Sequence, residues 1–214
     1  MNSFKYQYFK IKLEEDFFNM LMQAINESGH MQKEGLAIAE ENLMVAKVGG
    51  GQITKDRQCK VSFIDNPRVF ELLDGLVEFA NSKMLWNIKL DFIEPLQYTV
   101  YGEGEHYTWH HDEDLSSAYK PQNVGCRDKN AILNDKAHID AEYIRKLSFS
   151  LQLTDETTYE GGNFQLMDGK KTYFAPRKRG TLVVFDSRAM HRVLPVTKGT
   201  RKSIVGWTLG PRWR

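Results

Sequence analysis

The spacing of hydrophobic residues predicts two helices in the first part of the chain. Residues 14–27 carry apolar side chains at helical spacing, with acidic residues in the first turn, where the helix dipole favours them. Residues 69–79 show the same spacing, and Asn66-Pro67 is a typical start because proline is favoured at the first helical position. Residues 4–13 alternate between apolar and polar side chains, which predicts a strand.

From residue 89 onward the pattern changes to short alternating or apolar stretches that predict strands separated by turns. Many short strands of this kind are typical of a double-sheet jelly roll. We therefore expect a mainly β, cupin-like jelly roll with flanking α-helices that support one sheet. The expected strands are residues 59–64, 91–101, 147–154, 164–167, 181–186, 191–193 and 202–207, and the turn signals are Gly161-Gly162, Asp168-Gly169 and Lys198-Gly199.

The chain has the length of one domain, residues 1–214, and no internal repeat or linker divides it. We expect residues 1–90 to form a mixed helical support and residues 91–210 to form the jelly-roll core. Residues 113–145 are polar and weakly patterned, which is typical of a lid or substrate loop, and residues 140–146 have the pattern of a helical turn. A surface insertion without a role in binding is the alternative.

Composition indicates a globular chain without a strong overall electrostatic field. Of its 214 residues, 41% are hydrophobic and 27% are charged, and the net charge is +1, so no global basic field argues for nucleic acid. Two cysteines, Cys59 and Cys126, allow one disulfide but no disulfide framework. No apolar run approaches the roughly 18 residues of a membrane span. We therefore expect a reducing compartment, the cytoplasm, and no membrane partner.

The stretch from Tyr101 to Asp112, together with the distant His191, carries the candidate chemistry. Residues two apart in a strand point to the same face, so His110 and Asp112 can reach one metal while His111 points away. His191 follows a predicted buried strand and supplies a second imidazole. Two histidines and one carboxylate are the donor set of the iron site called the facial triad, which leaves positions open for a co-substrate and dioxygen.

Two other interpretations of these histidines remain open. His106 and His110 lie four residues apart, as in helical zinc sites, but the glutamate of the H-E-x-x-H pattern is missing and the residues between them are poor helix formers. His110 and Asp112 can also form an ordinary hydrogen-bonded surface pair. The downstream His191 favours the iron interpretation over both.

Arg201 stands ten residues after His191, across a predicted turn. Hairpin partners lie close in space, so we expect Arg201 to lie deeper between the sheets than His191. Its planar guanidinium suits bidentate binding of a carboxylate, such as the distal carboxylate of 2-oxoglutarate. Ser203, two residues on and on the same face, can add a hydroxyl donor. A surface charge at a turn is the alternative for Arg201.

Together these residues resemble the prolyl 4-hydroxylase-like group of Fe(II)/2-oxoglutarate-dependent oxygenases. The resemblance covers residues 97–209, whereas residues 1–90 are only similar to the helical support that such enzymes place before the core. The motifs are, in order, Tyr101-x-x-Gly104-x-x-Tyr107-x-Trp109-His110-x-Asp112; Gly161-Gly162-Asn163-Phe164; Pro176 with Gly180-Thr181-Leu182-Val183-Val184-Phe185; and His191-x-Val193-x-Pro195-Val196-x-x-Gly199-x-Arg201-x-Ser203 with Trp207.

The resemblance implies a double-stranded β-helix fold and a dioxygenase that couples hydroxylation to decarboxylation of 2-oxoglutarate to succinate and CO2. It implies Fe(II) as cofactor, 2-oxoglutarate and O2 as co-substrates, and ascorbate as a reductant. The implied iron ligands are His110, Asp112 and His191, the implied 2-oxoglutarate contacts are Tyr101, Arg201 and Ser203, and the implied substrate-side residues are Tyr107 and Trp207. Simple core packing is the alternative for the three aromatic residues.

Three positions bear on the subfamily. Asp112 is present, whereas related halogenases lack this carboxylate, and its presence favours hydroxylation. Trp207 stands where the nucleic-acid demethylases of the superfamily carry a second arginine, so nucleic acid is disfavoured as a partner. Collagen-type prolyl hydroxylases usually carry lysine at the anchor position, where this chain has Arg201, as oxygen-sensing and bacterial relatives do.

We therefore expect a prolyl (4-)hydroxylase, similar to the procollagen-proline 4-hydroxylases, that acts on a peptide or protein. Hydroxylation of a free amino acid or another small molecule is the first alternative. A nucleic-acid-modifying oxygenase and a non-catalytic jelly-roll binding module are further alternatives. The binding module is disfavoured because every catalytic position is intact.

Overall fold

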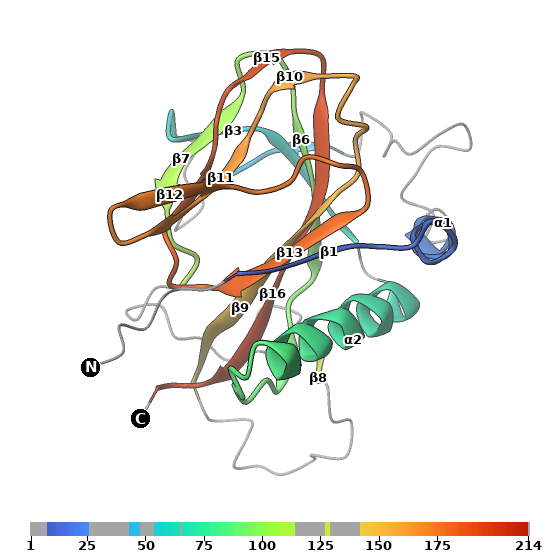
Figure 1. Cartoon of the computed structure of the whole chain (residues 1–214), viewed down its shortest axis with the longest axis vertical. Helices are drawn as coiled ribbons and strands as arrows, with labels where there is room; N and C mark the ends of the chain where they lie inside the picture. Colours follow the sequence, from blue (N-terminus) through green and yellow to red (C-terminus); the bar gives the residue numbers. More distant parts are fainter. Residues whose placement is uncertain are drawn as a thin grey trace.

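The computed structural model describes residues 8–25, 43–47, 54–64, 66–113, 127–128 and 142–213. Within these ranges the chain is mainly β, with two helices beside the strands (Figure 1). The helices are α1 (Glu15–Ile25) and α2 (Pro67–Lys83). The strands are β1 (Phe9–Lys12), β2 (Met44–Val45), β3 (Arg57–Gln58), β4 (Lys60–Ile64), β5 (Phe92–Ile93), β6 (Leu96–Tyr101), β7 (His106–His110), β8 (Arg127–Asp128), β9 (Tyr143–Gln152), β10 (Glu160–Gly161), β11 (Phe164–Asp168), β12 (Lys171–Phe174), β13 (Thr181–Asp186), β14 (His191–Val193), β15 (Val196–Lys198) and β16 (Arg201–Pro211).

The strands form two main sheets. The larger has nine strands and runs β1-β13-β9-β16-β6-β4-β2, with β5 paired to β16 and β8 to β5. The smaller has five strands in the order β12-β11-β14-β7-β3, and β10 pairs with β15. Phe185 of the larger sheet and Val193 of the smaller sheet pack in one buried cluster, so the two sheets lie face to face. The predicted mainly β jelly roll with flanking helices is confirmed.

Alternation along the strands gives the larger sheet two different faces. On β13, Leu182 and Val184 belong to the apolar cluster that includes both helices, whereas Val183 and Phe185 belong to the cluster between the sheets. Part of the inward face is polar yet buried, namely Ser148, Ser150 and Gln152 of β9 and Arg201 and Ser203 of β16. Buried polar groups need partners, so this inner surface is where a ligand is expected.

Local sequence sets the position of the helices behind the larger sheet. The side-chain oxygen of Asn66 caps α2 by accepting hydrogen bonds from the backbone N–H groups of Arg68 (3.0 Å) and Val69 (3.3 Å), and Pro67 follows as the first helical residue. The Asn66 amide also donates to the carbonyl of Ala24 at 2.9 Å, which joins the start of α2 to the end of α1. Neither described helix is long and apolar enough to cross a membrane.

The strand expected over residues 91–101 is divided in the structure into β5 and β6. The break falls at Glu94-Pro95, because Pro95 has no N–H to donate to a neighbouring strand. The Glu94 carboxylate turns instead to Arg145, whose Nε lies 2.6 Å away. This break places both charged side chains at the edge of the inner surface.

The expected helical turn over residues 140–146 is wrong from Tyr143 onward, because Tyr143 begins β9 and pairs with Pro211 of β16. Most of the expected lid, residues 114–126 and 129–141, lies outside the described residues, as do residues 1–7. Cys59 is a buried free thiol, and Cys126 lies outside the described ranges.

Gly206 of β16 provides a test of this packing. A Cβ at Gly206 would lie 2.2 Å from Phe149 Cζ and 2.8 Å from Leu96 Cδ2. We expect Gly206→Ala to lower the free energy of unfolding by about 1–3 kcal/mol through overpacking, measured by urea denaturation. Gly75→Ala on the exposed side of α2, where a Cβ meets nothing within 4 Å, should raise it by about 1 kcal/mol. A Gly206→Ala variant with an unchanged free energy of unfolding would contradict the close packing around β16.

Candidate active site

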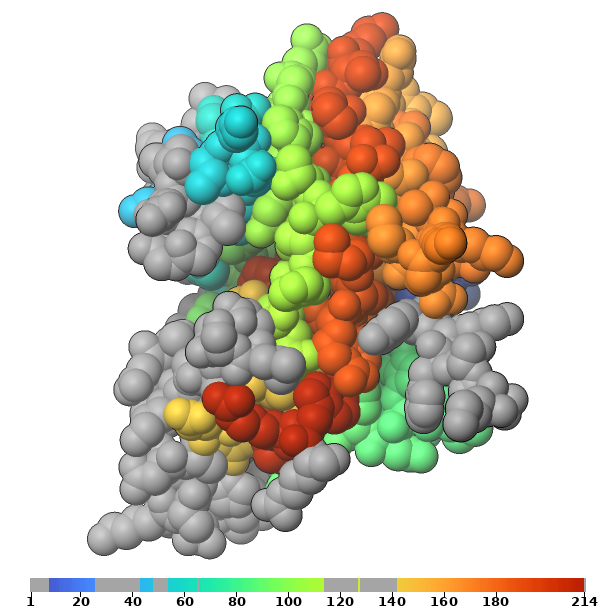
Figure 2. Space-filling view, turned by 90° about the vertical axis from the view of Figure 1, so that its left-hand side faces the viewer, coloured from blue at the N-terminus to red at the C-terminus, as the bar shows by residue number. Residues whose placement is uncertain are grey.

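A cavity of about 460 Å³ lies between the two sheets, against the inward face of β6, β9 and β16. In Figure 2 the surface is hollowed below the cyan segment that contains β3, beside the green segment that contains β7, the strand with which β3 pairs. All eight residues selected from the sequence contribute to the cavity wall: Tyr101, Tyr107, His110, Asp112, His191, Arg201, Ser203 and Trp207.

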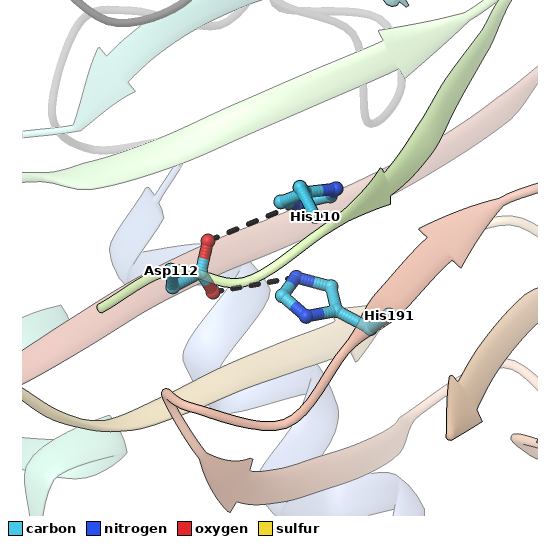
Figure 3. A group of neighbouring side chains, drawn as sticks. All are labelled: His110, Asp112 and His191. Atoms are coloured by element: carbon cyan, nitrogen blue, oxygen red, sulfur yellow. Dashed lines mark ion pairs between the residues drawn. The ribbon is translucent and has the colours of Figure 1, made fainter. Parts of the chain in front are cut away.

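His110, Asp112 and His191 form a compact cluster in this wall (Figure 3). One possible ligand atom from each residue lies within 4.8 Å of the other two. The Nε2 atom of His110 is 3.8 Å from Oδ1 of Asp112, and Nε2 of His191 is 3.4 Å from Oδ2. Antiparallel pairing of β14 with β7 sets His191 directly opposite His110. The expectation that Asp112 shares a strand with His110 is wrong, because β7 ends at His110 and Asp112 reaches the cluster from the bend that follows.

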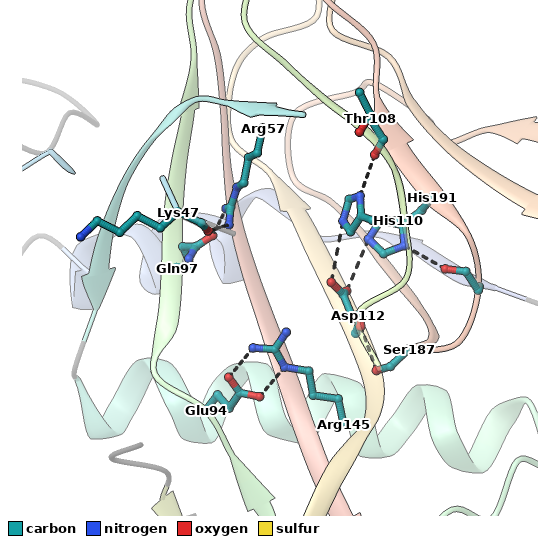
Figure 4. Close-up of polar contacts among 12 residues, drawn as sticks. Lys47, Arg57, Glu94, Gln97, Thr108, His110, Asp112, Arg145, Ser187 and His191 are labelled. Carbon is teal, nitrogen blue, oxygen red and sulfur yellow. Dashed lines mark hydrogen bonds and ion pairs between the residues drawn. The ribbon is translucent and has the colours of Figure 1, made fainter. Parts of the chain in front are cut away.

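Backbone carbonyls fix the orientation of both imidazole rings (Figure 4). Nδ1 of His110 lies 2.8 Å from the carbonyl oxygen of Thr108, and Nδ1 of His191 lies 2.9 Å from that of Ala189. A carbonyl oxygen only accepts, so each Nδ1 carries a proton, and in the neutral ring Nε2 keeps the lone pair that faces Asp112. This is the usual arrangement of histidines that bind a metal through Nε2.

The protonation states of the cluster also fit a metal. Burial and the neighbouring His191 lower the pKa of His110 to about 3, so its ring is neutral at pH 7. Burial raises the pKa of Asp112, but the two histidines and Arg145 outweigh it, and the pKa falls to about 2. Oδ2 of Asp112 is buried and has no hydrogen-bond partner among the described residues. An ionised oxygen without a partner, beside two unprotonated nitrogens, fits a divalent cation.

Contacts on the outer side of the cluster hold the backbone of Asp112. The N–H groups of Asp112 and Glu113 both donate to the carbonyl of Ser187, at 2.9 and 3.0 Å. The buried carboxylate of Glu113 accepts a hydrogen bond from Trp213 Nε1 at 3.4 Å and lies 3.9 Å from Arg188 Nε. Asp112 is therefore positioned by its backbone, and its carboxylate stays available to the cavity.

Arg201 lies at the start of β16 with 4% of its surface exposed. It stands directly opposite Tyr101 of β6, and Ser203 stands opposite Thr99. Nη1 of Arg201 donates to Ser203 Oγ at 3.4 Å, and no carboxylate in the described ranges pairs with it. A buried guanidinium on the cavity wall is thus free to bind an anionic group.

The Gly161-Gly162 turn makes room for this arginine. Gly162 has a φ of +59°, and a Cβ there would lie 2.9 Å from Val196 Cγ2 and 3.2 Å from Arg201 Cδ. At Gly161 a Cβ would approach the carbonyl oxygen of Pro195 to 2.4 Å. Both positions therefore require glycine, because the backbone is left-handed and a Cβ would meet Pro195 at residue 161 and Val196 and Arg201 at residue 162.

The aromatic residues line different parts of the wall. Tyr101 is buried, and burial raises the pKa of its phenol, so the hydroxyl keeps its proton and can donate. The ring of Tyr107 stacks on His110 with 3.5 Å between centroids. The indole Nε1 of Trp207 is buried and has no partner in the part of the chain that the structure describes. The three side chains contribute polar or aromatic surface to the cavity as well as packing.

Two arginines of the wall were missed by the sequence analysis. Arg145 donates to both oxygens of Glu94, at 2.6 and 2.7 Å, and lies over the ring of Trp207 at 4.0 Å. Arg57 donates to Gln97 Oε1 and lies 4.9 Å from the centre of the Tyr107 ring. Arg57 belongs to a two-residue strand and Arg145 to a stretch interpreted as lid, so neither carried a periodic signal.

The jelly roll and the two-histidine, one-carboxylate cluster between its sheets define the class of this protein. The family model of the 2OG-Fe(II) oxygenase superfamily matches residues 96–209, which is more than half of the chain. The chain belongs to this superfamily, whose name specifies Fe(II) and 2-oxoglutarate.

Curated relatives are PKHD-type hydroxylases. One from Synechococcus sp. (strain CC9311) is 39% identical over 74 residues, which are 33% of this chain and 34% of the relative. Another from Hyphomonas neptunium (strain ATCC 15444) is 27% identical over 168 residues, which are 78% of this chain and 66% of the relative. The matches therefore span less than two thirds of either relative.

Solved structures share the fold. A prolyl-4-hydroxylase from Pseudomonas putida superposes with a TM-score of 0.63 and 19% identity, covering 97% of this chain and 94% of that one. A prolyl hydroxylase from Trichoplax adhaerens, in complex with a hypoxia inducible factor peptide fragment, has a TM-score of 0.65 and 15% identity over 97% of this chain and 84% of that one.

The cluster predicts metal-dependent stability. Anaerobic addition of Fe(II), or of Mn(II) in air, should raise the Tm, because the ion binds the folded state. His191→Ala should abolish the increase. The matched control is His106→Ala, because Nδ1 of His106 bonds the Gly104 carbonyl at 3.2 Å and this histidine is outside the cluster. Thermal denaturation with metal and with EDTA measures both, and an increase that survives in His191→Ala would exclude the cluster as the metal site.

Proposed function

We propose that this chain is an Fe(II)- and 2-oxoglutarate-dependent dioxygenase whose iron is held by His110, Asp112 and His191. The observation that carries the proposal is the convergence of two Nε2 lone pairs and an ionised carboxylate, within 4.8 Å, on the wall of a cavity. This donor set occupies one face of Fe(II) and leaves positions for a co-substrate and dioxygen. The helical zinc alternative has no support, because His106 and His110 are the two ends of strand β7.

We assign Arg201 as the anchor of the distal carboxylate of 2-oxoglutarate. Its guanidinium is buried on the inward face and meets no described carboxylate, and the Ser203 hydroxyl lies beside it on the same face. Tyr101 stands directly opposite Arg201, and its protonated phenol is a further donor to the same group. A charge-assisted, bidentate contact from arginine gives such an anchor both strength and direction.

When bound, Fe(II), 2-oxoglutarate and O2 supply oxidative decarboxylation of 2-oxoglutarate to succinate and CO2, coupled to hydroxylation of the prime substrate. The chain positions these groups relative to one another and excludes water from the cavity that holds them. The hydrogen bonds from the Nδ1 atoms of His110 and His191 fix the rings. Tyr107 and Trp207 line the same cavity and would confine the substrate beside the cluster.

A prolyl residue in a peptide or protein is the prime substrate that we propose. The names of the relatives, PKHD-type hydroxylases, and of the structural neighbours, prolyl hydroxylases, support it. A free amino acid or another small molecule is the second candidate, because a cavity of about 460 Å³ has the size that encloses such a ligand. We also propose that residues 113–145 act as a lid over the substrate. The same proposal includes ascorbate as the reductant and a reducing cytoplasm as the place of action.

The cofactor assignment is tested by adding Fe(II) and 2-oxoglutarate anaerobically and recording the weak visible metal-to-ligand charge-transfer band. His110→Ala should abolish the band, and Arg201→Gln should weaken 2-oxoglutarate binding by about tenfold or more, because a charge-assisted pair is lost. Arg68→Gln on α2, an exposed arginine, is the matched control and should change neither. The absence of a band from folded, metal-loaded protein would refute the oxygenase assignment.

The substrate assignment is tested in air with proline-containing peptides and, separately, free L-proline. Mass spectrometry should detect hydroxyproline in peptide, in amounts equal to the succinate formed. Trp207→Ala should release more succinate than hydroxyproline, because the cavity no longer confines the substrate. Hydroxylation of free proline with none in peptides would favour the second candidate over the first.

A further inference from the structure

Arg57 places a positive charge in the wall of the cavity that no carboxylate of the described residues compensates. Its guanidinium donates to the Gln97 side-chain oxygen and, at 3.4 Å, to the carbonyl of Lys47, and it lies over the ring of Tyr107. All of these partners are neutral. Among the described residues its Nε is buried without a hydrogen-bond partner, and its further contact there is with the Cys59 thiol and not with a carboxylate. Burying a cation without an anion is costly, so this group is poised for an anionic ligand.

The contrast with Arg145 shows what is missing at Arg57. Both arginines lie over an aromatic ring of the cavity wall, Arg145 over Trp207 at 4.0 Å and Arg57 over Tyr107 at 4.9 Å. Arg145 is compensated by both carboxylate oxygens of Glu94, as Figure 4 shows. Arg57 has the amide of Gln97 in the corresponding role. The positive charge at Arg57 therefore remains available to a ligand.

The charge of the whole cavity points the same way. Four cations and two carboxylates of the described residues line it: Lys47, Arg57, Arg145 and Arg201, with Glu94 and Asp112. Fe(II) brings two positive charges and 2-oxoglutarate two negative ones, so loading leaves the excess of two positive charges unchanged. Low-dielectric walls concentrate the field of such an excess on a bound ligand.

We propose that the prime substrate carries a carboxylate next to the residue that is hydroxylated, and that Arg57 binds it. The occupant is an acidic peptide, with an aspartate or glutamate beside the target residue. This inference rests on the proposed function, because it concerns the substrate of the same iron site. Arg57 meets Tyr107, and Tyr107 stacks on His110 of the metal cluster, so a carboxylate at Arg57 would lie close to the reacting centre.

An acidic peptide fits better than a nucleic-acid strand, although both are anionic. A strand needs a positive surface along its backbone, whereas this chain has 29 basic and 28 acidic residues. The excess charge that we find is local and is enclosed with aromatic rings in the cavity. That arrangement suits one carboxylate on a compact ligand.

The test uses the anaerobic complex with Fe(II) and 2-oxoglutarate, whose charge-transfer band reports a ligand that binds beside the iron. Three peptides with blocked ends carry the same central proline and differ only in its neighbours, which are aspartate, asparagine or lysine. We expect the aspartate peptide to bind about tenfold more tightly than the asparagine peptide and the lysine peptide to bind more weakly still. Salt should weaken the aspartate peptide selectively in the wild-type protein.

Variants at Arg57 make the test specific. Arg57→Gln should remove the preference for the aspartate peptide, and Arg57→Glu should shift it to the lysine peptide, a reversal that a purely structural role would not produce. Arg57→Lys should keep part of the original preference. Arg68→Gln changes the net charge of the protein equally but lies on the exposed side of α2, so it should leave the preference unchanged.

The outcomes separate the two levels of the proposal. Equal binding of the three peptides, or a band that none of them changes, would overturn the charge assignment while the band itself upholds the cofactor chemistry. Absence of the band would refute the proposed function instead. Free L-proline and a single-stranded oligonucleotide are the comparison ligands. If either one binds in an Arg57-dependent way and the peptides do not, the proposal of an acidic peptide substrate is overturned.

Discussion

The antiparallel pairing of β16 with both β6 and β9 is the constraint on which the candidate site depends. It sets Arg201 opposite Tyr101 and Ser203 opposite Thr99. Because side chains alternate along a strand, this register turns Arg201 and Ser203 toward the cavity and Ile204 toward the apolar core beside the helices. A slip of one residue would exchange the two faces, burying polar groups among helices and filling the cavity with aliphatic ones.

The two faces of the larger sheet divide stability from function. The outer face and the helices form an apolar core, in which fully buried residues such as Leu73 and Phe149 pack. The cavity that the inner face borders keeps buried polar atoms without partners among the described residues, including Trp207 Nε1 of this sheet and, from the smaller sheet's side, Asp112 Oδ2 and Arg57 Nε. Leaving such groups unpaired costs free energy that a bound metal and anionic ligands would offset. The apolar core beside the helices stabilises the fold, and a bound metal and anionic ligands would satisfy the polar atoms of the cavity.

The charged groups of the cavity differ in how they are compensated among the described residues. Asp112 faces the imidazoles of His110 and His191, Arg145 faces Glu94, and Arg201 and Arg57 face no carboxylate in the described ranges. A dianion such as 2-oxoglutarate would satisfy Arg201 and a divalent metal together. The remaining positive charge at Arg57 would then attract the prime substrate. The charges of the cavity would thus support binding of the metal and 2-oxoglutarate first and of the prime substrate afterwards.

The sequence by itself determined the residues whose relation is local or repeated along a strand. His110 and Asp112 stand two apart, Arg201 and Ser203 likewise, and the glycines at 161 and 162 mark a turn, so short motifs made them candidates. His191 needed the motif as well, because its neighbour across the ladder is distant in the chain. Arg201 and Ser203 share a face because strand periodicity is set by a short segment, whereas Asp112 joins His110 from the bend that follows β7.

Only the tertiary structure decided which face of each strand is covered and what meets across the cavity. The alternation of Ser148 and Ser150 in β9 is the pattern of a solvent-exposed face, yet both serines are buried: Ser148 bonds Ser187 at 2.9 Å, and Ser150 lines the cavity. Arg57 and Arg145 come from strands β3 and β9 of different sheets and meet the same cavity. Periodicity gives a strand two faces, but the sheet packed against it determines which face becomes a site.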